Sequence, residues 1–301
     1  MIVPNQKVDG PLLDEKEVIL HIKREDTIHP LISGNKYRKL KYNLLEAQTQ
    51  GQKTLLTFGG AFSNHVAAVA CAGHEQGFQT IGVIRGEELE GSWPNNPTLQ
   101  RAHEHGMRFH FVSRSAYRQK NETHFLQKLK DRFGAFYLIP EGGTNELAVK
   151  GCTEILSGED SAFDFICCSV GTGGTVAGLI NSIQPNQTVL GFPALKGDFL
   201  KADIRTFAQN ERWQLITEYH FGGYAKVTPA LVQFINDFKK GTGIPLDPIY
   251  TGKLLFGIFE LIKQDFFPKG TQILAIHTGG LQGIKGMNQV LEQKKLPLLD
   301  V

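Results

Sequence analysis

Residues 163–179, FDFICCSVGTGGTVAGL, join an apolar run to a glycine-rich turn and then to a segment with a helical pattern. The apolar run over 163–170 predicts a strand, and its nearly continuous hydrophobicity is typical of a strand buried on both faces. The pattern over 174–183 predicts a helix. A buried strand that leads through glycines into a helix is the repeating unit of an α/β fold.

The rest of the chain repeats this alternation of short apolar runs and longer amphipathic stretches. Because strands that alternate with helices need crossover connections, the pattern predicts mostly parallel sheets flanked by helices. Ligands of such sheets bind beyond the carboxyl ends of the strands. The other predicted strands cover 53–58, 79–84, 107–112, 135–140, 188–194 and 272–278, and further predicted helices cover 62–76, 97–105, 117–132 and 228–240.

The composition is that of an ordinary globular protein. The 301 residues are 41% hydrophobic and carry a net charge of +2, which predicts neither a nucleic-acid partner nor an anionic membrane surface. No segment approaches the roughly 18 apolar residues of a membrane span, and the opening residues MIVPNQKVDG lack the apolar core of a signal peptide. We therefore expect a cytoplasmic protein whose cysteines are reduced, namely Cys71, Cys152, Cys167 and Cys168.

The turn GTGGT at 171–175 has the composition of a phosphate-binding loop. Glycines let backbone N–H groups approach an anion, and the start of the following helix adds partial positive charge. The alternative is a tight strand-to-helix turn that happens to use glycine. The dinucleotide spacing GxGxxG fails at Val176, and no GxxxxGK[ST] loop occurs. The pattern therefore indicates a smaller phosphate-bearing cofactor.

Lys36 follows Gly34 and Asn35 at the predicted start of a basic helix. The positive end of the helix dipole disfavours a charge on this lysine, and the neighbouring cations Arg38, Lys39 and Lys41 add to that effect. A lysine that holds its proton weakly is a good nucleophile toward a carbonyl group. The alternative is a solvated basic helix face.

Ser63 and Asn64 stand at a second junction of strand, glycines and helix, within FGGAFSNHVAAVA at 58–70. Either residue is suited to cap the helix, and the pair could also face a ligand in the same crevice. His65 is a candidate for acid–base work or a structural residue. His103, His105 and His110 do not converge on carboxylates or thiols at metal-ligand spacing, so we predict no metal site.

Three later stretches place hydroxyl groups next to glycine. They are FGGYAK at 221–226, DPIYTGK at 247–253 and AIHTGGLQG at 275–283, with the last two expected at the ends of extended segments. Their hydroxyl side chains are candidates to line a ligand site. Each stretch is also explained as a plain turn at the end of a strand.

Together these stretches resemble the D-cysteine desulfhydrase and 1-aminocyclopropane-1-carboxylate deaminase family, part of the tryptophan-synthase-β-like class of pyridoxal-phosphate enzymes. The resemblance spans nearly the whole chain and keeps the family order. It is carried by HIKREDTIHPLISGNKYRKLKY (21–42), GGAFSNHVAAVA (59–70), IPEGGTN (139–145), SVGTGGTVAGL (169–179), FGGYAK (221–226), DPIYTGK (247–253) and IHTGG (276–280). Ser33 departs from the family, which more often has glycine there.

The resemblance implies a pyridoxal 5'-phosphate cofactor and a role for each matching residue. Lys36 would bind the cofactor aldehyde and then shuttle the α-proton. Asn64 would hydrogen-bond the ring hydroxyl, and Ser63 with its backbone would bind the substrate carboxylate or move a proton. The phosphate would be held by Gly171, Thr172, Gly173, Gly174 and Thr175.

The resemblance also implies a substrate side and a partner for the pyridine nitrogen. Tyr224 and Tyr250 would line the substrate side. Thr251 would face the pyridine nitrogen, with Thr278 as the alternative. The deaminase pattern has Tyr-Glu-Gly where this chain has Tyr250-Thr251-Gly252. Because a carboxylate keeps the pyridine protonated and a hydroxyl does not, threonine makes the ring a weaker electron sink, which favours β-elimination over opening of a cyclopropane ring.

The resemblance therefore implies a two-domain enzyme, each domain an open, mostly parallel sheet flanked by helices. We expect a large cofactor-binding domain formed by 1–38 and 141–301, and a small domain formed by 39–140. The expected reaction is elimination from D-cysteine to give pyruvate, ammonia and sulfide, in a homodimer. The alternatives are 1-aminocyclopropane-1-carboxylate deaminase activity and a catalytically inert protein that binds pyridoxal phosphate.

Overall fold

The computed structural model describes residues 3–32, 34–197 and 199–300, and it contains two sheets. In the larger sheet β1 pairs antiparallel with β2, and all other neighbours are parallel. In the smaller sheet all neighbours are parallel. The order in the larger sheet is β1 (Asn5–Val8), β2 (Ile19–Lys23), β10 (Gln272–Ile276), β7 (Phe165–Val170), β8 (Thr188–Pro193) and β9 (Trp213–Leu215). The order in the smaller sheet is β5 (Met107–Val112), β4 (Gln79–Arg85), β3 (Thr54–Gly59) and β6 (Tyr137–Ile139).

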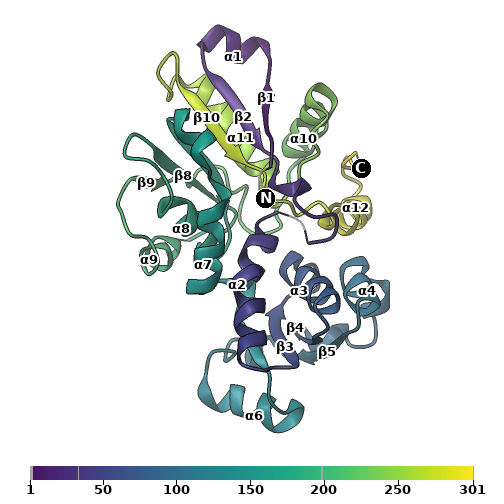
Figure 1. The fold of residues 1–301 in the computed structure, drawn as a ribbon. Helices are drawn as coiled ribbons and strands as arrows, with labels where there is room; N and C mark the ends of the chain where they lie inside the picture. Colours follow the sequence, from purple (N-terminus) through teal and green to yellow (C-terminus); the bar gives the residue numbers. More distant parts are fainter. Residues whose placement is uncertain (1–2, 33, 198, 301) are drawn as a thin grey trace.

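Helices cover both sheets, and α2 runs between them (Figure 1). The helices are α1 (Pro11–Lys16), α2 (Asn35–Thr49), α3 (Asn64–Glu75), α4 (Pro97–Glu104), α5 (Arg114–Tyr117), α6 (Thr123–Phe133), α7 (Glu146–Cys152), α8 (Gly174–Ile180), α9 (Phe199–Arg205), α10 (Pro229–Thr242), α11 (Thr251–Lys263) and α12 (Gly283–Gln293). Short 3₁₀ turns cover Glu25–Thr27, Glu87–Leu89, Trp93–Asn95, Glu141–Gly143, Thr153–Ile155 and Gly158–Ala162. Within the described ranges, no helix is long and apolar enough to span a membrane.

Alternate residues of each central strand enter different cores. In β10, Ile273 and Ala275 belong to one hydrophobic cluster, whereas Leu274 and Ile276 belong to another. In β3, Leu55 contacts one cluster and Leu56 the other. Strands with apolar residues on both faces must be covered twice, which is why helices lie on both sides of each sheet.

The α/β class predicted from the sequence is confirmed, and each predicted strand corresponds to an observed one. The sequence reasoning missed β1, β2 and β9. It also read 247–253 as the end of an extended segment, but Thr251 begins α11. The predicted boundary between residues 38 and 39 falls inside the continuous helix α2, and the division of the chain into two domains stays a prediction. Ser33 lies outside the described residues.

Candidate active site

A cavity of about 710 Å³ lies where the carboxyl ends of strands from both sheets face each other. Its walls come from segments that directly follow β3, β6, β7 and β10, together with the last residue of β4 and the start of α2. This is the place where open parallel sheets bind ligands. Ten of the twelve predicted site residues line it. They are Lys36, Ser63, Asn64, Gly171, Thr172, Gly173, Thr175, Tyr224, Tyr250 and Thr278.

Lys36 lies in the first turn of α2, half-buried at the cavity wall. Burial and the neighbouring charge of Lys39 lower its pKa to about 7. Its Nζ donates to Asn35 Oδ1 at 3.0 Å, and Asn35 Nδ2 donates to Thr175 Oγ1 at 2.7 Å. The amine is therefore partly neutral near pH 7, as a nucleophile toward a carbonyl requires. It is also connected through Asn35 to the glycine-rich loop.

Gly34 explains how α2 reaches this position. Its φ is +61°, and a Cβ placed there would lie 2.0 Å from the carbonyl oxygen of Thr278. The same carbonyl accepts the N–H of Asn35 at 3.3 Å. Only glycine allows this close approach, which fixes the start of α2 against the turn after β10.

The glycine-rich loop follows β7 and leads into α8. A Cβ on Gly171 would lie 3.2 Å from the ring of Tyr250, and a Cβ on Gly173, where φ is +81°, would lie 3.0 Å from Ile204. The Thr172 hydroxyl lies 2.5 Å from the Thr144 hydroxyl. The glycines thus serve close backbone approaches beside two hydroxyl groups, which suits a small anion.

Gly174 does not line the cavity. A Cβ there would lie 2.9 Å from the Thr144 side chain and 3.3 Å from Lys39 Nζ. The buried Lys39 donates to the Gly142 carbonyl and to Thr144 Oγ1, each at 3.1 Å, and it also lines the cavity. The sequence reasoning did not assign Lys39 a site, although its spacing of three residues puts it on the same helix face as Lys36. Its position beside the loop makes it a candidate phosphate ligand.

Ser63 is the N-cap of α3, because its Oγ accepts the N–H of Val66 at 3.3 Å. Both Ser63 and Asn64 also line the cavity, so capping and a ligand contact are compatible. His65 Nε2 lies 2.7 Å from the Thr57 hydroxyl, which donates its proton to the Ile139 carbonyl at 2.9 Å. The histidine therefore donates to Thr57, and burial holds its pKa well below the usual value.

Tyr224 and Tyr250 meet edge to face, with ring centres 6.4 Å apart. Burial raises the pKa of the Tyr250 phenol well above its usual value. The pKa of Tyr224 is also raised, chiefly by desolvation, although 42% of its surface stays exposed. Both phenols are thus protonated at neutral pH and lie where a proton is available to a ligand.

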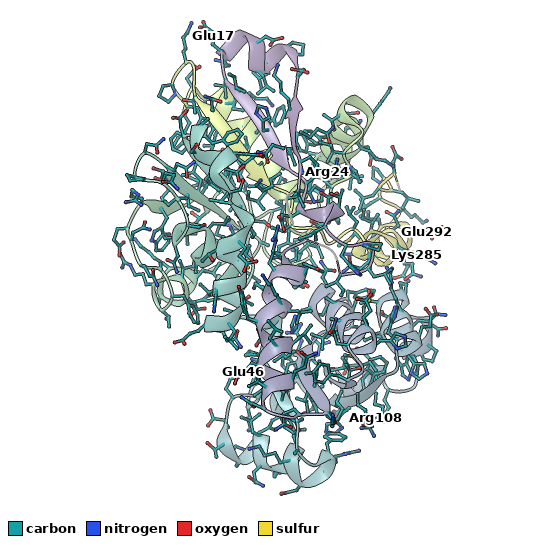
Figure 2. All side chains as sticks on the ribbon, viewed as in Figure 1. Glu17, Arg24, Glu46, Arg108, Lys285 and Glu292 are labelled. Carbon is teal, nitrogen blue, oxygen red and sulfur yellow. The ribbon has the colours of Figure 1, made fainter. Side chains whose placement is uncertain are left out.

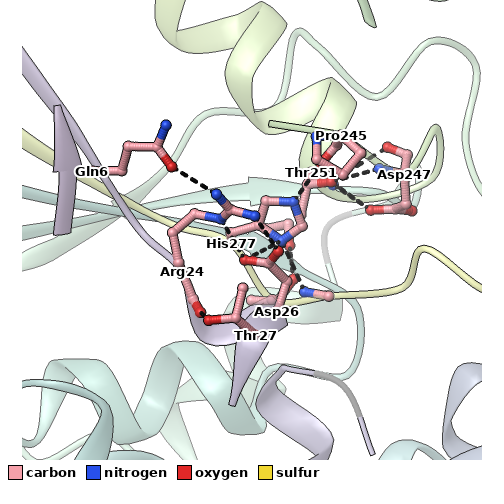
Figure 3. Close-up of polar contacts among 11 residues, drawn as sticks. Gln6, Arg24, Asp26, Thr27, Pro245, Asp247, Thr251 and His277 are labelled. Atoms are coloured by element: carbon pink, nitrogen blue, oxygen red, sulfur yellow. Dashed lines mark hydrogen bonds and ion pairs between the residues drawn. The ribbon is translucent and has the colours of Figure 1, made fainter. Parts of the chain in front are cut away.

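The two threonines that compete for the pyridine nitrogen occupy different environments. Thr278 lines the cavity, and its hydroxyl lies 3.2 Å from that of Ser169. Thr251 is fully buried and is not part of the cavity wall. Its hydroxyl donates to Asp247 Oδ1 at 2.7 Å and accepts the Asp247 N–H at 2.9 Å (Figure 3). The position of Thr251 therefore does not support the ligand role expected for it.

Asp247 is a residue that the sequence reasoning missed. Besides the Thr251 hydroxyl, its carboxylate accepts the N–H groups of Ile249, Tyr250 and Thr251 at 2.8–3.0 Å. These contacts organise the start of α11 and hold the backbone of Tyr250. A similar support lies beside Thr278, where His277 Nε2 lies 2.7 Å from the Pro245 carbonyl (Figure 3).

These residues fit pyridoxal phosphate. The cavity brings together an amine whose pKa is lowered, a glycine-rich loop that side chains would obstruct, and the amide and hydroxyl of Asn64 and Thr278. Lys36 would hold the aldehyde, the 171–175 loop with Lys39 the phosphate, Asn64 the ring hydroxyl and Thr278 the ring nitrogen.

Comparison with known proteins agrees with this fit. The family model described as "Pyridoxal-phosphate dependent enzyme" matches residues 7–279. A putative 1-aminocyclopropane-1-carboxylate deaminase of Pyrococcus horikoshii is 32% identical over 282 residues, which cover 88% of this chain and 85% of the relative. The bifunctional D-cysteine desulfhydrase/1-aminocyclopropane-1-carboxylate deaminase of Arabidopsis thaliana is 30% identical over 296 residues, covering 88% of this chain and 73% of that protein.

A solved structure described as an ACC deaminase homologue superposes with a TM-score of 0.84 at 27% identity, covering 97% of this chain and 94% of that one. A threonine deaminase isoform of Solanum lycopersicum, at 18% identity and a TM-score of 0.65, shares the fold. The chain is therefore a pyridoxal-phosphate-dependent enzyme and belongs to the family that contains the 1-aminocyclopropane-1-carboxylate deaminases and D-cysteine desulfhydrases.

Proposed function

We propose that this enzyme catalyses α,β-elimination from a small amino acid, with D-cysteine as the substrate and pyruvate, ammonia and sulfide as the products. The observation that carries the proposal is the hydroxyl of Thr278 on the cavity wall. Among the described residues that line the cavity, the acids are Glu141 and Asp203, and Glu141 already accepts the Tyr117 hydroxyl at 2.7 Å.

The choice of reaction follows from the group beside the ring nitrogen. The cofactor supplies an electron sink for the pair released at the α-carbon, and the sink is stronger when a carboxylate keeps the ring nitrogen protonated. A threonine hydroxyl supplies no such negative charge. Elimination tolerates a weaker sink because the leaving group carries the electron pair away. The same reasoning holds whether Thr251 or Thr278 contacts the pyridine nitrogen, since both residues are threonine.

The protein's own groups then have separate tasks. Lys36 takes the α-proton, and the start of α3 with Ser63 binds the substrate carboxylate. Tyr224 or Tyr250 donates a proton to the leaving sulfur. In the overall reaction the Cα–H and Cβ–S bonds break, a Cα–Cβ double bond forms, and water hydrolyses the released enamine to pyruvate and ammonium. Positioning these groups around one carbon atom is the main contribution of the fold.

The alternative activity is deamination of 1-aminocyclopropane-1-carboxylate. It is supported by the Arabidopsis relative, whose name assigns both activities to one protein. The oxoacid distinguishes the two, because ring opening gives 2-oxobutyrate and elimination from cysteine gives pyruvate.

The test incubates the holoenzyme with D-cysteine, L-cysteine and 1-aminocyclopropane-1-carboxylate and identifies the oxoacid released. We expect pyruvate from D-cysteine and none from a Lys36→Ala control. Release of 2-oxobutyrate alone would establish the alternative, and full activity of Lys36→Ala would remove the mechanism. The resemblance also leads us to propose a homodimer, which sedimentation of the holoenzyme tests directly.

A further inference from the structure

Arg85 is a cation of the cavity wall that none of the steps above uses. It is the last residue of β4 and is exposed at the cavity. Its guanidinium carbon lies 5.7 Å from the ring centre of Tyr117, a residue only 3% exposed. A cation over the face of an immobile aromatic ring is held in place by the ring quadrupole. The guanidinium is therefore oriented and at the same time open to a ligand.

No acidic side chain neutralises Arg85 within the described part of the chain, where it has neither a hydrogen bond nor an ion pair. The neighbouring acids have other partners. Glu141 accepts the Tyr117 hydroxyl and lies 3.3 Å from Lys120 Nζ, and Glu88 pairs with Arg114 at 2.9 Å. The cavity wall thus presents a planar fork of N–H donors, the group that matches a carboxylate in a bidentate manner.

The surroundings of Arg85 place it on the substrate side. Its Nη2 lies 3.6 Å from the point where a Cβ on Gly60 would stand, and Gly60 opens the turn that carries Ser63 and Asn64. The positive charge of Arg85 also acts on the Tyr224 phenol, opposing the effect of burial on its pKa. Since the start of α3 already serves the α-carboxylate in the proposed function, Arg85 is available for a second anionic group.

We propose that Arg85 is a specificity-determining residue that binds a carboxylate on the β-substituent of the substrate, so that amino acids with an anionic leaving group are preferred to neutral ones of similar size. This inference rests on the proposed elimination. For S-carboxymethylcysteine, Lys36 takes the α-proton, the Cβ–S bond breaks with its electron pair on sulfur, and thioglycolate leaves. Water then converts the released enamine to pyruvate and ammonium.

The test compares S-carboxymethylcysteine with S-methylcysteine, both enantiomers of each, in the holoenzyme and in Arg85→Gln and Arg85→Lys variants. Arg108→Gln is the matched control, because Arg108 is an exposed arginine of the adjacent strand β5 (Figure 2) and does not line the cavity. Pyruvate release gives kcat/KM, and for a compound that the holoenzyme does not turn over, calorimetric titration gives the dissociation constant.

We expect Arg85→Gln to lower kcat/KM for the carboxymethyl substrate by about 10- to 100-fold, the range for loss of a charge-assisted contact, and to change the methyl substrate less than about twofold. Arg85→Lys should retain part of the preference, and Arg108→Gln should leave it unchanged. An equal loss for both substrates, or no loss for either, would overturn the role of Arg85.

Failure of the elimination itself has a different signature. If the wild-type holoenzyme releases pyruvate from none of these substrates or from cysteine, the proposed function fails. The calorimetric comparison then still decides the role of Arg85. Tighter binding of the carboxymethyl compound that is lost in Arg85→Gln supports it, and equal binding in both proteins refutes it.

Discussion

Replacing Thr251 by valine tests whether this threonine supports Asp247 or contacts the cofactor. The substitution keeps the shape of the side chain but removes its hydroxyl, which donates to Asp247 Oδ1 at 2.7 Å and accepts the Asp247 N–H at 2.9 Å. Losing a hydrogen bond to a charged group costs about 1.5–3 kcal/mol, and a buried N–H without a partner costs about 1–3 kcal/mol. Because Oδ1 keeps the Thr251 N–H at 2.8 Å, the two costs overlap. We expect the free energy of unfolding to fall by about 2–4 kcal/mol.

The assay is thermal or urea unfolding of the cofactor-free protein, together with the affinity for pyridoxal phosphate measured by its absorbance. Thr251→Val should lower the melting temperature by about 3–6 °C and leave unchanged the absorbance spectrum of pyridoxal phosphate bound to Lys36. Thr278→Val is the matched variant. It should change that spectrum and cost less stability, because among the described residues its hydroxyl contacts only the Ser169 hydroxyl, at 3.2 Å. A stable Thr251→Val protein with an altered spectrum would refute this reasoning and would indicate that Thr251 contacts the cofactor.

Three further predictions concern Lys36 and its supports. Only the neutral amine of Lys36 attacks the aldehyde, and the pKa of this amine is lowered to about 7. The rate at which the cofactor-free protein takes up pyridoxal phosphate should therefore rise as the pH increases through about 7 and level off above it. Stopped-flow absorbance measures this rate, and a rise centred near pH 10 would contradict the prediction. Lys39→Met should raise the pKa of Lys36 by removing a neighbouring charge, which moves the midpoint of the uptake profile to higher pH. It should also weaken the affinity for the cofactor at least about tenfold. An unchanged midpoint and affinity would show that Lys39 affects neither the pKa of Lys36 nor cofactor binding. Gly34→Ala should abolish the absorbance spectrum of pyridoxal phosphate bound to Lys36, because the added Cβ would lie 2.0 Å from the Thr278 carbonyl oxygen and alanine disfavours a φ of +61°. Normal cofactor binding by this variant would show that the start of α2 can move.

The candidate site was predictable wherever its signal is local. The strand, glycines and helix of 165–180, the helix start at Lys36 and the cap at Ser63 each depend on contacts within a few residues. Such short-range hydrogen bonds and hydrophobic periodicity can be predicted from neighbouring residues in the sequence. The family resemblance then assigned chemistry to these positions, and the comparisons support the cofactor it implied.

The sequence by itself determined the α/β class and the order of the strands it predicted, and it marked Lys36 and the 171–175 loop as candidates to bind an aldehyde and a phosphate. Only the tertiary structure decided which of two similar threonines meets the cavity, because Thr251 and Thr278 both precede glycine and differ only in what packs around them. It also brought Lys39 beside the 171–175 loop, the Asp247 carboxylate to the backbone N–H of Tyr250, and Arg85 to the cavity wall. Those positions depend on segments far apart in the chain, and a side chain's neighbours across such distances are set by how sheets and helices pack, not by the residues beside it.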